Sequence, residues 1–329
     1  MIGLAERKRA VPAEAGLVAR GRLTIGLLNN MPDAAMALAE RQFGDLLTAA
    51  AGGAEVELRL FALPEVARGE RARTAMKGRY QSAEALGTAG LDGLIVTGVE
   101  PRTPELTDEP YWPGLAKVID WTREAAMPTV WSCLAAHAAV LRLDGIKRRP
   151  LPVKLSGVFQ SEVVDDATMI GPAPMITPHS RQNGLWADDL LARGYRILAH
   201  SLDAGVEAFV RPGPCVSLFL QGHPEYDGDT LMLEYQRDVT RFLRGERPSH
   251  PQAPAGYFDP RTEAALAAIA ADARRRPTPT LAPRYAAALL DAAPAVTWRD
   301  SAVRLYRGWL GQFAGRSPAA RHGFGRFAS

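Results

Sequence analysis

Short apolar runs alternate with longer helical patterns over the first half of the chain. The runs cover residues 23–28, 55–61, 93–98 and 128–132, and two of the intervening segments place apolar side chains at helical spacing. This alternation predicts an α/β fold with a doubly wound, mostly parallel, flavodoxin-like sheet. Because ligands bind such sheets at the carboxyl ends of the strands, the residues that follow each run are the first candidates for function.

The pattern changes after Lys154. Four strand-like stretches separated by turn residues follow, and then an amphipathic helix over 229–243. A Pro- and Gly-rich stretch leads on to further helical patterns near 262–275, 283–292 and 298–313.

These changes divide the chain into three parts. Residues 1–20 form an N-terminal tail, and residues 21–246 form the α/β domain that is expected to carry the chemistry. Residues 247–329 form an appended C-terminal helical segment, packed on the core and ending in a basic tail. We expect this segment to be an extension and not an independent domain.

The composition argues against several classes of protein. A formal net charge of +3 over 329 residues is small and scattered, which disfavours a nucleic-acid-binding surface. The two cysteines, Cys133 and Cys215, are too few for a disulfide scaffold or a structural zinc site. Charges interrupt the N-terminal stretch where a signal peptide needs apolar residues, and no run approaches the length of a membrane span. We therefore expect a cytoplasmic protein without a membrane partner.

Cys133 closes the run "PTVWS" and opens the alanine-rich segment "CLAAHAAVL". A thiol on a tight strand-to-helix turn has the position of a nucleophile elbow, and a helix N-terminus lowers the pKa of a thiol. The glycines of the strict elbow pattern are missing, although Ser132 and Ala135 are small enough to substitute for them. Two interpretations stay open: a catalytic nucleophile, with His137 as a candidate base, or a buried, inert cysteine.

Two further stretches concentrate polar side chains. "LFLQGHPEYD" (218–227) ends a strand-like run with His223 and Glu225, whose spacing puts both side chains on one side of an extended chain. A carboxylate there can orient a histidine, and the histidine can serve a thiol elsewhere in the fold. "ITPHSRQN" (176–183) is dense in hydrogen-bond donors, and we interpret it as a loop between strands.

Nine segments, in order from about Leu23 to Asp238, carry a resemblance to one known family. They are "LLNNMPDAAMALAERQF", "GLIVTG", "DEPYWPGL", "VIDWTRE", "SCLAAHAA", "KLSGVF", "PHSR", "GHPEYDGDTL" and "EYQRD". The chain resembles the homoserine O-acyltransferase (homoserine O-succinyltransferase) family, which has a class I glutamine-amidotransferase-like fold. The resemblance extends to "TWRDSAVRLYRGWLGQF" near the C-terminus. It implies acyl transfer from acyl-CoA to the hydroxyl of L-homoserine in methionine biosynthesis.

In that family a cysteine takes the acyl group as a thioester, and the homoserine hydroxyl then attacks it in a ping-pong reaction. The resemblance maps the nucleophile to Cys133, the base to His223 and the orienting carboxylate to Glu225. His137 stands where the family carries Gln, so we expect it to pack beneath the elbow and not to transfer the proton.

The resemblance also implies contacts with the substrates. Backbone N–H groups of Leu134 and of the turn at Gly98 and Val99 are expected to stabilise the oxyanion. Arg237 matches the arginine that grips the homoserine carboxylate, and Lys154 and Ser180 match further positions of the substrate site.

The choice of acyl group in the family depends on the loop after "TG", where glycine accompanies succinyl and glutamate accompanies acetyl. Arg102 aligns with that position and matches neither pattern. A guanidinium can pair with the distal carboxylate of succinate, which acetyl lacks, so we predict succinyl-CoA as the donor. Glu100, two residues away, can neutralise Arg102 or line the pocket itself.

The expected substrates are L-homoserine and acyl-CoA, which acts as a co-substrate. We expect no resident cofactor or metal. The default expectation for the assembly is a homodimer. Three alternatives are weighed against this reading: transfer onto another amino-acid hydroxyl such as that of serine, a glutamine amidotransferase-type amidase, and a non-enzymatic regulator. The missing elbow glycines disfavour the amidase, and the presence of all three triad residues disfavours the regulator.

Overall fold

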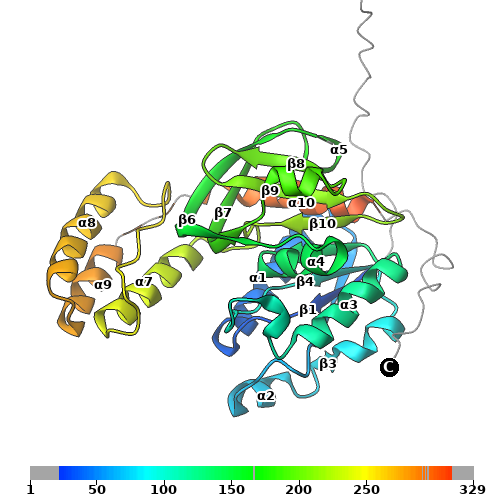
Figure 1. The fold of residues 1–329 in the computed structure, drawn as a ribbon, viewed down its shortest axis with the longest axis horizontal. Coiled ribbons are helices and arrows are strands. Elements are labelled where there is room, and N and C mark those ends of the chain that lie inside the picture. The colour runs from blue at the N-terminus through cyan, green and yellow to red at the C-terminus, as the bar shows by residue number, and fades with distance from the viewer. Residues whose placement is uncertain (1–21, 166, 291, 293, 295, 313–329) are drawn as a thin grey trace, which may run out of the picture.

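A computed structural model describes residues 22–165, 167–290, 292, 294 and 296–312. The predicted N-terminal tail and the basic stretch near the C-terminus lie outside the described residues. Within the described part, the strands form one mixed sheet that helices flank (Figure 1).

The sheet has a parallel half and an antiparallel half. Its strands are β1 (Arg22–Leu28), β2 (Glu55–Ala62), β3 (Tyr80–Ser82), β4 (Gly93–Val96), β5 (Thr129–Ser132), β6 (Arg149–Val163), β7 (Met175–Gly184), β8 (Arg196–Ser201), β9 (Gly205–Arg211) and β10 (Ser217–Leu220). Strands lie parallel in the order β3-β2-β1-β4-β5-β10, and antiparallel pairs continue the sheet through β9, β8, β6 and β7. The order β2-β1-β4-β5-β10 is that of a flavodoxin-like sheet, so the predicted fold class is confirmed.

Helices cover both faces of the sheet. The α-helices are α1 (Met36–Ala50), α2 (Glu70–Met76), α3 (Trp112–Glu124), α4 (Leu134–Asp144), α5 (Ala167–Ile170), α6 (Ala187–Leu191), α7 (Thr230–Leu243), α8 (Pro260–Arg275), α9 (Ala282–Leu290) and α10 (Arg299–Gly311). Short 3-10 helices are η1 (Asp33–Ala35), η2 (Ala83–Thr88), η3 (Leu106–Asp108) and η4 (Pro279–Leu281). None of the described helices has both the length and the apolar composition needed to cross a membrane.

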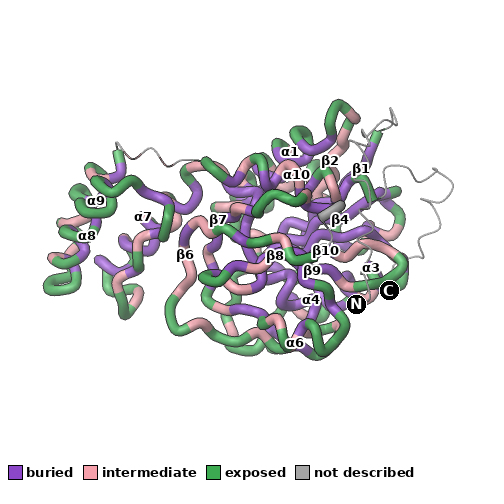
Figure 2. Tube along the Cα trace, turned by 90° about the horizontal axis from the view of Figure 1, so that it is seen from above, coloured by how far each residue is buried: buried purple, intermediate pink, exposed green. Residues whose placement is uncertain are grey.

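Two apolar cores lie on opposite faces of the sheet. Helices α1, α5 and α10 cover one face, and α3 and α4 cover the other, with the buried backbone running between them (Figure 2). Successive residues of one strand enter different cores, because side chains alternate across a strand: Val130 packs on the α1 and α10 side, and Trp131 packs with α3 and α4.

The predicted helical extension divides into two parts. Helices α8 and α9 pack on α7 around a third apolar core and lie at one end of the molecule, away from the sheet (Figure 1). Helix α10 instead returns to the sheet and packs on α1, α5 and β7. Trp298, at the start of α10, donates its indole N–H to the backbone oxygen of Tyr226 at 2.8 Å. The start of α10 is therefore hydrogen-bonded directly to the "GHPEYD" segment.

The interpretation of "ITPHSRQN" as a loop is wrong. The stretch lies within β7, which pairs with β6 from Met175 to Gly184. Its alternate side chains Thr177, His179 and Arg181 are buried. The polar composition concealed the strand because the partners of His179 and Arg181, which are Glu207 and the Ala204 oxygen, come from distant segments that a local pattern does not show.

Candidate active site

Cys133 sits on a strained turn between β5 and α4. Its backbone has φ 52° and ψ −111°, and the described non-glycine residues with positive φ are Ala126 and Cys133. The Cys133 N–H donates to the Leu220 oxygen of β10 at 2.8 Å, which fixes the turn to the neighbouring strand. A cysteine held in a disfavoured backbone conformation between a strand and a helix has the geometry of a nucleophile elbow.

His223 and Glu225 reach the thiol because β10 lies parallel to β5. Ser132 pairs with Leu220, so the segments after both strands leave the sheet at the same edge. His223 Nδ1 lies 2.8 Å from Glu225 Oε1, and both side chains are more than nine-tenths buried. The structure therefore brings together the three residues predicted as a catalytic triad.

The charge balance around His223 favours its protonated form. Burial lowers the pKa of this imidazole, but the charges of Cys133 and Glu225 and side-chain hydrogen bonds to both outweigh burial and raise it well above its usual value. A raised histidine pKa beside a thiol favours an imidazolium–thiolate pair. The arrangement can therefore supply both a nucleophile and a proton donor.

Tyr226 and Glu234, for which no role was predicted, extend this centre. The ring of Tyr226 stacks on His223 with centroids 4.3 Å apart, and its hydroxyl donates to Glu234 Oε1 at 3.0 Å. Burial and the Glu234 carboxylate raise the pKa of the Tyr226 hydroxyl well above its usual value, so it stays a hydrogen-bond donor. Both residues lie inside the quoted motifs "GHPEYD" and "EYQRD", which was their one available signal.

The expected oxyanion donors also come together. A Cβ added to Gly98 would lie 2.9 Å from the Leu134 Cβ and 3.2 Å from the Leu134 N, so the turn after β4 rests against the start of α4. Val99 follows and packs at the edge of the α3–α4 core. Only glycine allows this approach, which places two backbone segments beside Cys133.

His137 is buried in α4 and does not act on the thiol in this geometry. Its Nε2 lies 3.2 Å from Gln221 Oε1, which also accepts the Leu185 N–H at 2.7 Å. Burial and the charge of Arg181 lower the pKa of His137 to about 3, so the ring stays neutral near pH 7. This environment supports a packing role.

The predicted substrate residues gather around one carboxylate. Lys154 Nζ lies 3.0 Å from Asp238 Oδ2, Arg237 Nη2 lies 2.9 Å from Asp238 Oδ1, and Arg247 Nη1 lies 3.2 Å from Oδ2. Lys154 also lies 3.8 Å from Glu234, whose other contacts include the Ser180 hydroxyl. We call Lys154, Ser180, Glu234, Arg237, Asp238 and Arg247 the acceptor cluster.

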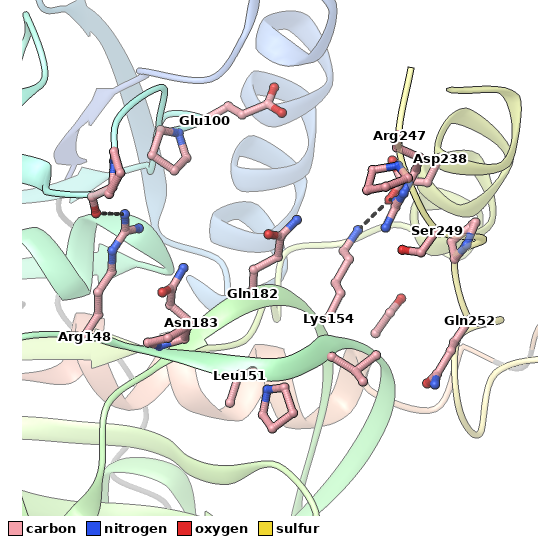
Figure 3. A pocket seen from close by; sticks show the side chains of 18 of the residues that line it. Glu100, Arg148, Leu151, Lys154, Gln182, Asn183, Asp238, Arg247, Ser249 and Gln252 are labelled. Carbon is pink, nitrogen blue, oxygen red and sulfur yellow. Dashed lines mark hydrogen bonds and ion pairs between the residues drawn. The ribbon is translucent and has the colours of Figure 1, made fainter. Parts of the chain in front are cut away.

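A large groove contains most of this cluster. Its volume is about 1080 Å³, and its lining comes from α4, β6, α7, the loop after β4 and the segment after α7. Figure 3 shows Lys154, Asp238 and Arg247 at one end and Arg148 at the other. Asp238, Arg247 and Arg148 are absent from the predicted site, because their positions in it depend on contacts between distant segments.

Arg102 and Glu100 do not pair with each other. Arg102 is exposed and lines a smaller pocket of about 270 Å³. Glu100 lies 3.7 Å from Arg241 of α7. Among the described residues, no group of three or more His, Cys, Asp or Glu side chains has the arrangement of a metal site.

The chain is similar to known proteins over most of its length. The family model of homoserine O-succinyltransferase matches residues 12–318. A homoserine O-succinyltransferase of Methylorubrum extorquens is 47% identical over 291 residues, 88% of this chain and 86% of the relative. That of Rhodopseudomonas palustris is 46% identical over 290 residues, 88% of this chain and 87% of the relative.

A solved glutamine amido transferase from Methylobacillus flagellatus is 14% identical, with a TM-score of 0.49 over 89% of this chain and 95% of that protein. The family match covers most of the chain and includes the whole of the described site. The chain therefore belongs to the homoserine O-succinyltransferase family.

Proposed function

We propose that this protein transfers a succinyl group from succinyl-CoA to the hydroxyl of L-homoserine through a thioester on Cys133. The observation that best supports this mechanism is that the buried His223–Glu225 pair lies beside the thiol of the strained Cys133 turn. The names of the relatives support the choice of substrates. The reaction serves methionine biosynthesis, as the family resemblance implies.

The first half-reaction loads the enzyme. The Cys133 thiolate attacks the thioester carbonyl of the donor, the new Sγ–C bond forms, and the bond from that carbon to the CoA sulfur breaks. His223 gives its proton to the departing CoA thiolate. Backbone N–H groups of Leu134 and of the Gly98–Val99 turn stabilise the oxyanion that forms on the carbonyl oxygen.

The second half-reaction unloads it. His223, now neutral, takes the proton of the homoserine hydroxyl while that oxygen attacks the thioester on Cys133. The Sγ–C bond breaks, and the thiolate and imidazolium return. Glu225 accepts from Nδ1 throughout, which leaves Nε2 for the proton in transit and stabilises the imidazolium.

The acceptor cluster binds homoserine. Its cations, Lys154, Arg237 and Arg247, outnumber the carboxylates of Asp238 and Glu234 by one, so one cation is left to bind the carboxylate of the zwitterionic ligand. Glu234 and Ser180 can take the ammonium group of the same ligand. Because Glu234 also holds Tyr226 against His223, the bound amino acid lies beside the base.

Intact-protein mass spectrometry tests the mechanism. Succinyl-CoA should add one succinyl group to the wild-type protein, Cys133→Ala should abolish the addition, and Cys215→Ala should leave it unchanged. L-Homoserine should discharge the adduct, and L-serine should not. Absence of an adduct with both succinyl-CoA and acetyl-CoA would falsify the proposal, and release of ammonia from glutamine would support an amidase instead.

We propose further that the enzyme is a cytoplasmic homodimer that needs no resident metal or cofactor. Closed dimers are the commonest assembly of soluble enzymes, and the two half-reactions balance with the protein and its two substrates alone. Light scattering should give twice the chain mass. Activity should survive dialysis against a chelator; a loss restored by a metal would contradict the second expectation.

A further inference from the structure

We propose that Arg148 binds the distal carboxylate of the succinyl group and thereby selects succinyl-CoA over uncharged acyl donors. This inference rests on the proposed function, since it concerns the acyl group carried on Cys133. It assigns to Arg148 the role that sequence alignment suggested for Arg102.

The donor itself defines what the site must contain. Succinyl carries a carboxylate two methylene groups beyond the thioester carbonyl, whereas acetyl ends at a methyl group. That carboxylate loses part of its hydration when the thioester reaches Cys133, so the protein must replace the lost water with a cation or hydrogen-bond donors. A planar guanidinium that is not already paired is the best match for a carboxylate.

Two arginines lie within the electrostatic reach of Cys133. Burial lowers the pKa of both Arg148 and Arg181. Nearby groups raise it: Tyr111, Glu109, Glu105 and then Cys133 at Arg148, and Cys133 and Glu207 at Arg181. Arg148 also acts on the buried ring of His137, one helical turn after the thiol. In space, Arg148 lines the same groove as His137 and Leu141, which follow Cys133 by about one and two turns of α4, and Gln182, next to Arg181, lines that groove as well.

The guanidinium group of Arg181 already forms hydrogen bonds within the protein. Its side chain is buried, and it donates to the backbone oxygens of Asn183 and Ala204 and toward His179 Nδ1 at 3.4 Å. Each of its three guanidinium nitrogen atoms, Nε, Nη1 and Nη2, therefore already has an acceptor. A substrate carboxylate would have to displace these contacts inside the β7 layer.

Arg148 has the opposite character. It is half-buried on the segment that joins α4 to β6, and it lines the groove together with His137 and Leu141. Its Nη2 donates to the Pro104 oxygen at 3.2 Å, and within the described residues it forms no ion pair (Figure 3). Most of its N–H donors are therefore available to a ligand in the groove.

The carboxylates around Arg148 are engaged elsewhere. Glu109 Oε1 accepts from the N–H groups of Arg102 and Thr103 and from the Thr103 hydroxyl. Glu105 lies 3.6 Å from Lys147. Both acids act on Arg148 at longer range, but within the described residues neither forms an ion pair with it, so its guanidinium can still take a carboxylate from the groove.

Arg102 fits this role less well. It is exposed, and it lines the smaller pocket and not the large groove. Arg149, the neighbour of Arg148, is also occupied: it pairs with Asp189, and its guanidinium carbon lies 5.3 Å from the centre of the Trp186 ring. Arg149 therefore provides a matched control of the same residue type, one position away.

Steady-state kinetics with three donors test the inference. Wild-type enzyme should prefer succinyl-CoA to butyryl-CoA, which has the same chain length without the charge, and to acetyl-CoA. Arg148→Gln should lower kcat/KM for succinyl-CoA about 100-fold, as expected for loss of a partly desolvated charge pair. The values for butyryl-CoA and acetyl-CoA should change less than about threefold, since these donors make no charged contact. Arg149→Gln should leave all three values unchanged.

A second variant covers the case in which Arg148→Gln folds poorly. Arg148→Lys keeps the charge and loses the fork, so it should retain part of the preference for succinyl-CoA. Equal losses with charged and uncharged donors would show a structural role and overturn the inference. A selective loss of succinyl-CoA activity in Arg102→Gln, with none in Arg148→Gln, would return the role to Arg102. Failure of the wild-type enzyme to form an acyl adduct would instead overturn the proposed function.

Discussion

The thiol centre, formed by Cys133, His223 and Glu225, and the acceptor cluster are built in different ways. Backbone geometry fixes the thiol centre: the elbow is strained, its N–H is bound to β10, and two parallel strands deliver the thiol and the base to one edge. Charge fixes the acceptor cluster, where side chains from β6, α7 and the following segment surround Asp238. Substitutions should therefore lower activity by large factors at the thiol centre and by smaller factors at the acceptor cluster.

The largest expected effect concerns Glu225. Glu225→Gln removes the charge that stabilises the His223 imidazolium, so kcat should fall by about 10³–10⁴-fold. The pKa of His223 should also fall, because the Glu225 charge helps to raise it; NMR titration of the ring should therefore show loss of its proton at a lower pH. The exposed substitution Glu263→Gln is the control, and a kcat near the wild-type value in Glu225→Gln would remove Glu225 from the mechanism.

A single added methyl group should also slow the reaction at the thiol centre, although less strongly. Gly98→Ala would place a Cβ 2.9 Å from the Leu134 Cβ and push the two oxyanion segments apart. We expect kcat to fall about 100-fold, the cost of losing one oxyanion donor. Gly44→Ala, whose added Cβ would lie 3.9 Å from its nearest neighbour, should have no such effect. Equal kcat values for the two variants would contradict the prediction that the thiol centre depends on the close approach of Gly98 to Leu134.

The acceptor cluster should respond more gently. Asp238→Asn weakens the anchor of Lys154 and Arg237, so the KM for homoserine should rise about tenfold, or ~1.4 kcal/mol. The rate of succinyl adduct formation should stay unchanged, because the first half-reaction does not use homoserine. Rapid-quench mass spectrometry separates the two effects, and an equal loss in the acylation rate would show that the two regions are not independent.

His137 should affect stability and not catalysis. Its pKa is about 3 in the folded protein against an ordinary value of 6.5, so below about pH 6.5 the unfolded chain binds a proton that the folded ring does not. The free energy of unfolding should therefore fall with decreasing pH, by up to about 1.4 kcal/mol per pH unit. His137→Gln should flatten this dependence in urea titrations. A fall in kcat as large as that of His223→Ala would instead make His137 a catalytic residue.

Local pattern was enough to predict much of the fold. The apolar runs at 23–28 and 93–98 became β1 and β4, and the helix expected over 229–243 became α7 (Thr230–Leu243). These elements are set by short-range preferences and by burial on a sheet with two covered faces. The strand β7 was missed because its buried polar side chains, such as His179, have the composition of a loop.

Local sequence patterns predict the type of sheet and a strand-to-helix turn at Cys133, and the motifs shared with the family imply that this thiol works with His223 and Glu225. Contacts between distant segments decide that Arg148 lines the groove with no ion partner among the residues that the structure describes, and that Arg247 pairs with Asp238. The physical reason is range: strand and turn preferences act between near neighbours, whereas the availability of a charge depends on every group that the fold brings within a few ångströms.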